Sequence, residues 1–358
     1  RWLLWWLLYR LMFLSGLLKL TSGDLTWRGL TALTFHYETQ PLPTMFGWYM
    51  HQLPAWWHRA SCAGMFVIEL IAPFLFFAPR ALRHNAALIT IALMVIIALT
   101  GNYTFFNLLT IPLCVLCLDD TWWRTILPTR LTRLAPLAPV APVAQCHVLR
   151  DIHDNFSYQV TTQCHVIGDI VLRRRIVRSA GWVAAVGVFV FTLAQEIAAF
   201  RAVPGLAPLA RAVGPFRSFN SYGLFRVMTN PRPELIFEGS DDGRDWRAYE
   251  FPHKPGALTR RPTWVAPHQP RLDWQLWFAA LGSPAQNRWV LALCEHLLRG
   301  TTEVLALVSE NPFPKKPPRH IRVVRYEYHF TDPATRSRTG QWWRRTPRDF
   351  YVQPSALK

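Results

Sequence analysis

Long apolar stretches alternate with short polar ones in the first 200 residues. A helix needs roughly 20 mainly apolar residues to cross the hydrocarbon core of a bilayer. The pattern predicts five spans, at about 2–20, 60–78, 85–100, 103–118 and 181–200. The third and fourth spans come from one long apolar run that is broken at Thr100-Gly101-Asn102, which is a turn signal. We therefore expect a polytopic membrane domain over residues 1–200.

The hydrophobic pattern changes after residue 200. The segment ELIFE at 234–238, the turn GSDDG and the segment DWRAYEF at 245–251 predict a β-hairpin. Apolar and polar residues alternate from Val324 to Phe330, as in a half-buried strand. Helical patterns lie between these strands, at 273–281 and 288–300. The expected fold class is a multi-span α-helical membrane domain, followed over 201–358 by a mostly β, sandwich-like soluble domain with a helical insert.

The charge distribution indicates the topology. The chain has only 17% charged residues against about 25% in globular proteins. Arg residues gather in two connections, at 80–84 and 121–178, and short basic connections stay in the cytoplasm. The soluble domain would then lie on the opposite, extracytoplasmic or lumenal side. The sequence pI of about 10.3 is typical of nucleic-acid-binding proteins, but no nucleic-acid-binding motif is present, so we expect no nucleic acid partner.

The polar stretch FHYETQPLPTMFGWYMHQLP at 35–54 separates the first two predicted spans. Prolines at 41, 43 and 54 prevent one continuous helix. Tryptophan and tyrosine are enriched at membrane interfaces, and this region holds Trp48, Tyr49, Trp56 and Trp57. We predict that residues 35–54, called the ledge below, lie at the outer face of the membrane and support the soluble domain. A pair between Glu38 and Arg271 is one expected contact.

Four ionisable residues in and near the ledge are candidates for chemistry. Glu69 lies in the middle of a predicted span, where an ionisable group indicates a functional site by default. Together with His36, Glu38 and His51 it could carry out acid–base catalysis or bind a metal. The structural alternative is that Glu69 forms a hydrogen bond across the helix bundle while His36 and Glu38 hold the ledge in place. No G-x-S-x-G, H-E-x-x-H or phosphate-binding loop is present, which favours a role other than that of an enzyme.

A near-repeat lies in the connection 121–178, with QCHVLRDI at 145–152 and QCHVIGDI at 163–170. Its Cys and His residues are the residue types of a structural zinc site, and they are Cys146, His147, Cys164 and His165. Neighbouring side chains point apart, which makes adjacent Cys-His pairs poor zinc ligands. We therefore interpret the repeat as a locally duplicated, loosely ordered loop and expect no metal and no cofactor.

Several long motifs together resemble the lipase maturation factor family. They are WRGLTALTFHYETQPLP, WYMHQLP and TGNYTFFNLLT in the first half, and NPRPELIFEGSDDG, APHQPRLDWQLWFAALG and ENPFP in the second. The match covers about 1–120 and 179–358, and it places motif positions at Tyr37, Gln40, Pro41, Pro43, Gly101, Asn102, Tyr103 and Asn107. The chain looks like a bacterial member that lacks the first span or spans.

The resemblance implies a membrane-bound, chaperone-like factor for the folding and maturation of secreted proteins. Family members in animals reside in the endoplasmic reticulum membrane, with the C-terminal domain in the lumen, and assist secreted homodimeric lipases. A bacterial member would lie in the inner membrane. The expected partners are a client lipase and the lipid bilayer. The alternative is a membrane enzyme or a lipid-handling protein, with a site around His36, Glu38, His51 and Glu69.

Aromatic residues of the soluble domain are candidates for client contact, since tryptophan is enriched at binding hot spots. The candidates are Trp264, Trp274, Trp277, Trp342 and Trp343. The alternative is that most of them belong to the hydrophobic core.

Overall fold

The computed structural model describes residues 1–126, 157–198, 203, 205–216 and 222–356. They form two compact units, which are described separately. The first combines Arg1–Leu7 with Leu118–Tyr222, and the second combines Leu8–Cys117 with Gly223–Lys358. The sequence suggested a division at 200/201. In the structure most of the membrane helices belong to the same unit as the C-terminal domain, because the two make extensive contacts.

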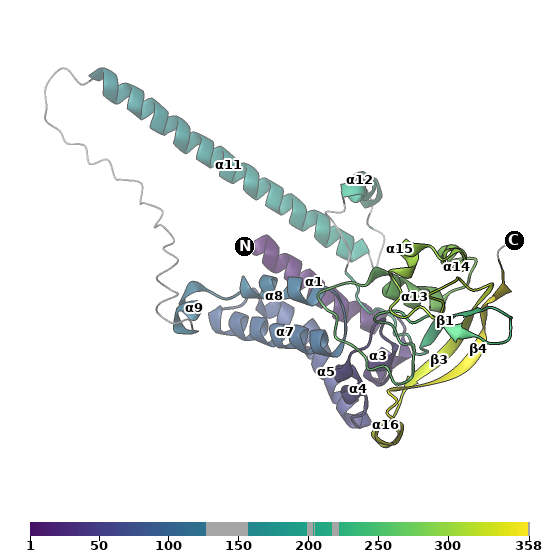
Figure 1. The fold of residues 1–358 in the computed structure, drawn as a ribbon. Coiled ribbons are helices and arrows are strands. Elements are labelled where there is room, and N and C mark those ends of the chain that lie inside the picture. The colour runs from purple at the N-terminus through teal and green to yellow at the C-terminus, as the bar shows by residue number, and fades with distance from the viewer. Residues whose placement is uncertain (127–156, 199–202, 204, 217–221, 357–358) are drawn as a thin grey trace. The chain divides into compact units, whose positions relative to one another are not determined.

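The first unit is helical in its described part (Figure 1). It contains α9 (Asp120–Ile126), α11 (Ser157–Ala198), α12 (Leu206–Val213) and the 3-10 turn η1 (Gly214–Phe216). At the N-terminal end of α1 (Trp2–Thr21), the Trp6 indole N–H donates to the Thr192 hydroxyl at 2.9 Å. Helix α11 is 42 residues long, so it extends well beyond the expected span into the connection. The second repeat copy, 163–170, lies on this helix, whereas the first copy lies outside the described residues.

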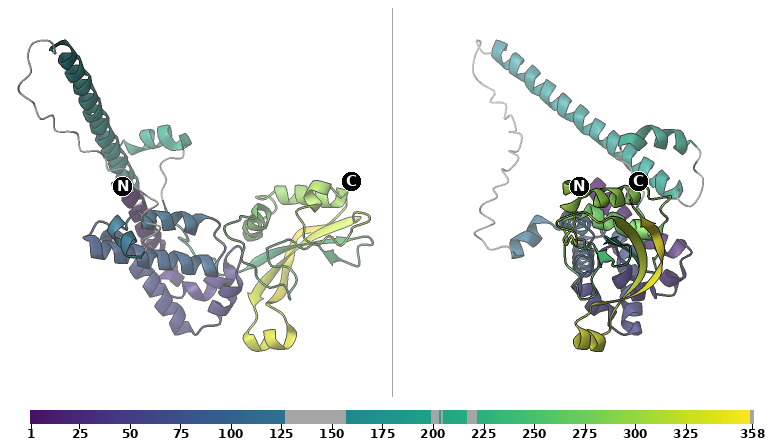
Figure 2. Two further views of the ribbon diagram at one scale, coloured as in Figure 1. Left: turned by 60° about the vertical axis from the view of Figure 1, so that its left-hand side comes forward. Right: turned by 45° about the vertical axis from the view of Figure 1, so that its right-hand side comes forward.

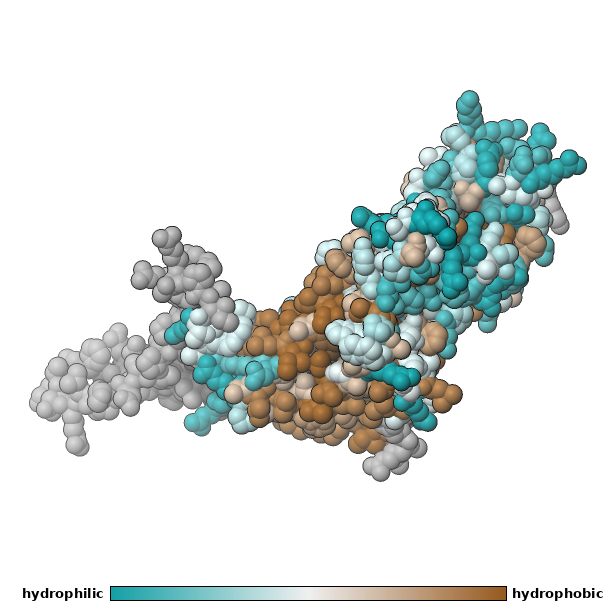
Figure 3. Space-filling view, turned by 90° about the horizontal axis from the view of Figure 1, so that it is seen from below, coloured by the Kyte–Doolittle hydropathy of each residue, from teal (hydrophilic) through white to brown (hydrophobic). Residues whose placement is uncertain are grey.

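The second unit begins with most of α1 and continues through a series of helices. They are α2 (Leu25–Arg28), α3 (Ala32–Thr39), α4 (Met45–His51), α5 (Ala55–Leu70), α6 (Ala72–Leu75), α7 (Arg80–Thr100) and α8 (Phe106–Val115). Outward-facing side chains on α5, α6 and α7, such as Val67, Phe74 and Ile96, are apolar and exposed. Figure 3 shows this surface as a broad apolar region (brown) that gives way to a hydrophilic one (teal).

Four helical segments of the described chain are long and apolar enough to cross a membrane. They are Trp2–Thr21, Ala55–Leu75, Arg80–Thr100 and Arg175–Ala198. The fourth predicted span, 103–118, contains only the ten-residue helix α8, with Pro112 inside it. Helix α8 packs along α7, and the Arg83 side chain donates to the Cys117 carbonyl at 2.9 Å. The predicted helical hairpin is present, but its second arm is shorter than expected.

The C-terminal part of the second unit holds one antiparallel sheet of four strands in the order β2-β1-β3-β4. The strands are β1 (Pro233–Ser240), β2 (Arg247–Ala248), β3 (His320–Phe330) and β4 (Trp343–Ser355). The predicted hairpin joins β1 to β2, with Glu238 opposite Ala248. In its turn, the Asp242 carboxylate accepts the backbone N–H groups of Arg244 and Asp245. This is the Asx-type turn expected from the sequence.

Helices cover one face of this sheet, in the place where a second sheet would complete a sandwich. They are α13 (Arg271–Leu281), α14 (Trp289–Arg299) and the short α15 (Thr302–Leu305), while α16 (Pro333–Thr339) lies in the β3–β4 connection (Figure 2). Gly300 ends α14 with φ +66°, as its position after the helical pattern predicts. The predicted class, a membrane domain followed by a mostly β domain with inserted helices, is confirmed.

Alternation along the strands divides the core of this part into two layers. Leu235 and Phe237 of β1 pack with α13 and α14, whereas Ile236 packs with Tyr37 and Trp48 of the ledge. Every residue of β1 is therefore buried. The side chains of a strand alternate between its two faces, so the sheet is covered by helices on one face and by the ledge on the other.

Candidate functional site

The ledge is a helix–extended–helix segment between two spans. Helix α3 ends at Thr39, the chain is extended to Pro43, and Thr44 begins α4 by accepting the Gly47 N–H at 3.0 Å. The Thr44 hydroxyl also donates to the Leu99 carbonyl at 2.9 Å. The prolines predicted to break this segment do so, and the break lies against the C-terminal end of α7.

The turn after α7 fixes the extended part of the ledge. Pro43 forms an isolated antiparallel bridge with Gly101, and the Gln40 side chain donates to the Thr100 carbonyl at 2.8 Å. A side chain at Gly101 has no room, because its Cβ would overlap the Gln40 side-chain oxygen and the Tyr103 ring. Gln40, Pro43, Gly101 and Tyr103, which the family resemblance marked, thus belong to one contact.

We expect Gly101→Ala to destabilise the protein, since forcing a methyl group into a packed site costs about 1–3 kcal/mol. The matched control is Gly64→Ala in α5, where an added Cβ meets nothing within 4 Å. Thermal unfolding of both variants in detergent measures the difference. Equal melting temperatures for the two variants would contradict the tight packing at the turn.

Asn102 connects the turn to the C-terminal domain. Its side-chain N–H2 donates to the carbonyls of Leu42 at 3.1 Å and Thr263 at 2.8 Å. Its side-chain oxygen accepts the backbone N–H groups of Val265 and Ala266. One amide thus joins the ledge, the turn and the loop that precedes α13, and its buried position makes each of these hydrogen bonds costly to lose.

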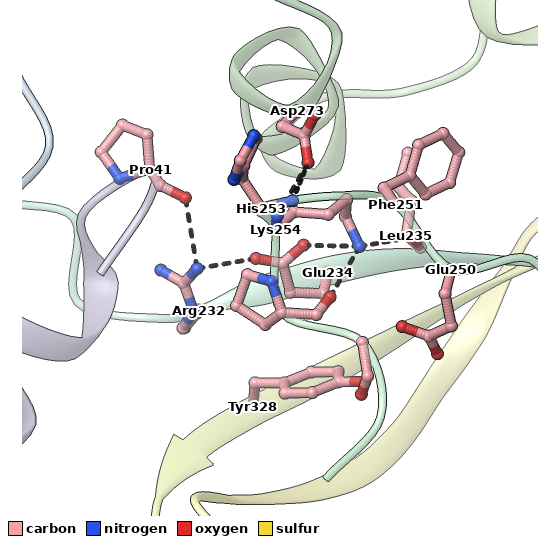
Figure 4. Close-up of polar contacts among 12 residues, drawn as sticks. Pro41, Arg232, Glu234, Leu235, Glu250, Phe251, His253, Lys254, Asp273 and Tyr328 are labelled. Atoms are coloured by element: carbon pink, nitrogen blue, oxygen red, sulfur yellow. Dashed lines mark hydrogen bonds and ion pairs between the residues drawn. The ribbon is translucent and has the colours of Figure 1, made fainter. Parts of the chain in front are cut away.

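Arg232 is the main link between the sheet and the ledge (Figure 4). Its guanidinium donates to the Pro41 carbonyl and, at 2.8 Å, to the Glu234 carboxylate. It also donates to the backbone carbonyls of Glu38 and Gln40. The Arg232 side chain is fully buried. The planar fork of arginine suits several acceptors at once, so a single side chain holds the end of α3 and the start of the extended segment.

A second buried cation completes this charged group. The Lys254 ammonium lies 3.1 Å from the other Glu234 oxygen and donates to the Leu235 and Pro255 carbonyls. Glu234 therefore pairs with two cations at 0% side-chain exposure. Breaking a buried ion pair by removing one partner is strongly destabilising, so the three residues form one structural unit at the ledge.

Glu38 turns its carboxylate toward the sheet, where it contacts the end of β3 rather than Arg271. Its two oxygens accept from the His329 ring at 3.1 Å and from the Phe330 N–H at 3.0 Å, and His51 lies 3.8 Å away. Burial alone would raise the pKa of Glu38, but the His329 hydrogen bond and the nearby His51 leave it below its ordinary value. The expected pair with Arg271 is wrong, because Arg271 is exposed at the start of α13.

The Glu38–His329 pair should make the attachment of the sheet depend on pH. Its hydrogen bond to Glu38 raises the pKa of His329 above 6.5. A raised pKa in the folded state gives stability that is complete below about pH 6.5 and is lost as the pH rises through the folded pKa. The lowered pKa of Glu38 contributes stability that is present above about pH 4.5 and is lost as the pH falls through the folded-state pKa. Besides Glu38, the charged neighbours of His329 are Arg344 and Glu327.

The measurement compares wild type with His329→Gln by thermal unfolding at about pH 6 and pH 8.5. We expect wild type to be the more stable of the two at pH 6 and the difference to shrink at pH 8.5. Glutamine can still donate a hydrogen bond but does not titrate. A difference that is constant over this range would show that the pair does not titrate in the folded protein.

His36 has a different partner from Glu38 and His51. Its Nε2 lies 3.0 Å from the Tyr103 hydroxyl, and the two rings stack with centroids 6.1 Å apart. Burial, with a smaller effect from the positive Lys19, lowers the pKa of His36 to about 4. The neutral ring is therefore part of the turn packing, as the structural alternative proposed.

Glu69 pairs with a lysine inside the membrane region. The Lys19 ammonium lies 2.6 Å from both Glu69 carboxylate oxygens, and both side chains are buried. Lys19 also lies 5.4 Å from the Trp27 ring. The four candidates for chemistry thus separate into three places: the Lys19–Glu69 pair, the His36–Tyr103 contact, and the Glu38–His51 neighbourhood.

The candidate tryptophans for client contact differ in how deeply they are buried. Trp277, Trp342 and Trp343 are buried, and Trp277 donates to the Thr39 carbonyl of the ledge. Trp274 is half-buried, while Trp264 is 57% exposed and donates to the Ala98 carbonyl of α7. The core alternative thus describes the three buried tryptophans. Tyr37 and Asn107 are also buried.

The zinc candidates cannot be placed. Cys146 and His147 lie outside the described residues, and Cys164 and His165 lie on α11 in a part whose side chains are not described.

Comparison with known proteins follows the two parts of the chain. A family model described as the lipase maturation factor transmembrane domain matches residues 1–125, and one described as the lipase maturation factor C-terminal domain matches residues 218–353. The chain belongs to the lipase maturation factor family. The C-terminal match includes Arg232, β1, β2, β3 and all but the last two residues of β4, so both sides of the ledge contact belong to family domains.

Relatives in this family agree over nearly the full chain. Lipase maturation factor 2 of Homo sapiens is 38% identical over 413 residues, with 96% of this chain and 58% of that protein covered. Lipase maturation factor 2 of Gallus gallus is also 38% identical, with the same coverage, and lipase maturation factor 1 of Mus musculus is 33% identical, with 99% of this chain and 59% of that protein covered. The chain spans about three fifths of the length of these relatives. No solved structure matches it.

Proposed function

We propose that this integral membrane protein is a maturation factor that assists the folding or assembly of secreted lipases. Family membership supports the proposal, since the relatives carry that function in their names. The main structural support for this function is the attachment of the sheet to the ledge through Arg232, Glu38 and Asn102. A domain fixed on a membrane ledge can hold a client close to the bilayer surface while the client folds.

We further propose that the C-terminal domain faces the lumen of the endoplasmic reticulum, or the periplasm in a bacterium. The basic connections at 80–84 and 121–178 support this orientation. The hydrogen bond between Arg83 and Cys117 supports it too, because it brings the two ends of the α7–α8 hairpin together. The test applies a membrane-impermeant reagent from the lumenal or periplasmic side of sealed membranes to chains with a single cysteine at the exposed Asp241 or at Arg133. Labelling at residue 133 but not at 241 would reverse the orientation.

The alternative of a membrane enzyme or lipid-handling protein has no support from the comparisons. Within the described residues the candidate side chains also have structural partners, since Glu69 pairs with Lys19 and Glu38 accepts from His329. A Glu38→Gln variant separates the two roles. We expect this variant to keep part of its maturation activity in proportion to its stability, whereas a catalytic carboxylate would lose all activity at normal expression.

The experiment for the proposed function is a secretion assay in cells that lack their own maturation factor. We expect expression of the chain to raise the amount of secreted, active lipase and to leave a monomeric, unrelated secreted protein unchanged. The variant Arg232→Ala should lower the lipase yield, and Arg271→Ala should not. Equal lipase activity with and without the chain would contradict the proposal.

A further inference from the structure

A cavity of about 390 Å³ opens between α4 of the ledge and α16 of the β3–β4 connection. Its lining includes Trp48, Tyr49, Gln52, Arg336, Ser337 and Trp342. Pockets for small ligands typically enclose about 300–1,000 Å³ and combine aromatic walls with a few polar groups. The size and lining of this cavity are therefore those of a binding site.

Arg336 supplies the charge of the cavity. Its guanidinium lies 3.7 Å from the Trp342 ring centroid and 5.0 Å from that of Trp48, so two indoles hold it in place. Among the described residues its side chain donates no hydrogen bond and pairs with no carboxylate. In contrast, Arg325 and Arg348 on the same hairpin pair with Asp349 and Glu327. The guanidinium of Arg336 thus has N–H donors left for a ligand.

Trp48 and Gln52 in the cavity wall supply no further free donor at the surface. Trp48 is 1% exposed, and its indole N–H meets no acceptor in the part of the chain that the structure describes. A buried polar group normally has a hydrogen-bond partner. Gln52 is already used, because it donates to the carbonyls of Trp48 and Thr331. The fixed guanidinium of Arg336 between aromatic walls therefore favours an anionic ligand.

The surroundings of the cavity indicate where that anion comes from. Phe46 and Tyr49 of α4 are 45% and 48% exposed, and Trp56 and Trp57 at the start of α5 are 65% and 42% exposed. Helix α5 begins one of the candidate spans, and exposed aromatic residues at the end of a span mark the headgroup level of a bilayer. We therefore expect the cavity to lie at the level of the lipid headgroups, in the leaflet on the side of the C-terminal domain.

We propose that this cavity binds the phosphodiester headgroup of a membrane phospholipid. Arg336 donates to the phosphate oxygens, for which the fork of a guanidinium is well suited. The exposed aromatic side chains of α4 and α5 lie against the start of the acyl chains. A lipid bound there contacts the ledge and α16 at once, so it stabilises the attachment of the hairpin to the membrane surface.

Photolabelling of the full chain in nanodiscs tests the proposal. The probe is a phosphatidylethanolamine that carries a photoreactive group on its headgroup. We expect adducts on the peptides of α4 and α16, and about tenfold less labelling there in Arg336→Gln, as for the loss of a charge-assisted hydrogen bond. The matched control is Arg338→Gln, which removes an exposed charge from the same helix outside the cavity and should label like wild type.

Competition in the wild-type chain identifies the ligand even where a variant folds poorly. We expect excess phosphatidylglycerol to prevent labelling, and diacylglycerol, which lacks the phosphate, to leave it unchanged. Equal competition by diacylglycerol, or no adducts at α4 and α16, would overturn the proposal. Competition by soluble glycerol phosphate or by an acidic peptide as strong as that by the lipid would also overturn it, since the site would then bind a soluble anion or a protein segment.

Discussion

Replacing Arg232 by alanine is expected to release the C-terminal sheet from the ledge. The change leaves the Glu234 carboxylate with Lys254 alone and removes the donor to three ledge carbonyls. Removing one partner of a buried ion pair costs about 3–5 kcal/mol. This is a large part of the total stability of a typical domain, which is about 5–15 kcal/mol. Arg232→Lys should recover only part of the loss, because an ammonium cannot reach all these acceptors from one position.

Hydrogen exchange of the full chain in detergent localises the effect. We expect faster exchange in the ledge and at the end of β3 in Arg232→Ala, whereas the amides of α13 and α14, which pack on the other face, change much less. The control Arg271→Ala should behave like wild type, because Arg271 is exposed. Uniform loss of protection throughout the sheet would show that Arg232 supports the domain core and not its attachment.

The second large effect is expected at the Lys19–Glu69 pair. Converting Glu69 to glutamine keeps its shape and its ability to accept a hydrogen bond, yet it leaves the Lys19 ammonium without its counter-ion in the membrane region. Charged side chains in such positions are costly unless they are paired. We therefore expect Glu69→Gln and Lys19→Met each to destabilise the protein by about 3–5 kcal/mol.

A double-mutant cycle shows whether the pair acts as one unit. The cycle compares Lys19→Met and Glu69→Leu with the double variant Lys19→Met/Glu69→Leu. The double variant removes both charges, and such apolar replacements are often neutral or stabilising. We expect it to be more stable than either single variant, as measured by thermal unfolding in detergent. Additive losses would mean that the two residues stabilise the protein independently. Gly16 of α1 lies against Glu69 of α5, because a Cβ added at Gly16 would be only 3.0 Å from the Glu69 Cβ. The two helices therefore pack closely beside the Lys19–Glu69 pair.

Features that depend on neighbouring residues were predictable from the sequence. The hairpin at GSDDG, the alternation from Val324 to Phe330 and the end of α14 at Gly300 follow from local turn chemistry and periodicity. The breaks at Pro41 and Pro43 follow from the restricted backbone of proline. The ledge itself was therefore predictable as a segment.

The partners of the ledge were not predictable, because they are distant in the sequence. Arg232 is 191–194 residues from the carbonyls that it contacts, and His329 is 291 residues from Glu38. The sequence does not show which of its many arginines lies near Glu38, and the predicted partner, Arg271, was wrong. Nothing in the sequence pairs Lys19 with Glu69, which lies 50 residues away. Helix α8 is shorter than its apolar run because the turn before it delays its start to Phe106 and it ends at Val115.

The contacts of Arg232, Glu38 and Asn102 should hold the ledge and the C-terminal sheet together as one rigid body in the membrane. The distance between spin labels on Phe46 of α4 and Arg338 of α16, which are both exposed, measures this directly. The labels are read by pulsed electron spin resonance in nanodiscs, on a chain whose native cysteines have been replaced. We expect one narrow distance distribution in the wild-type background and a broad one in Arg232→Ala. A broad distribution in the wild-type background would show that the sheet moves freely over the ledge and would contradict the account.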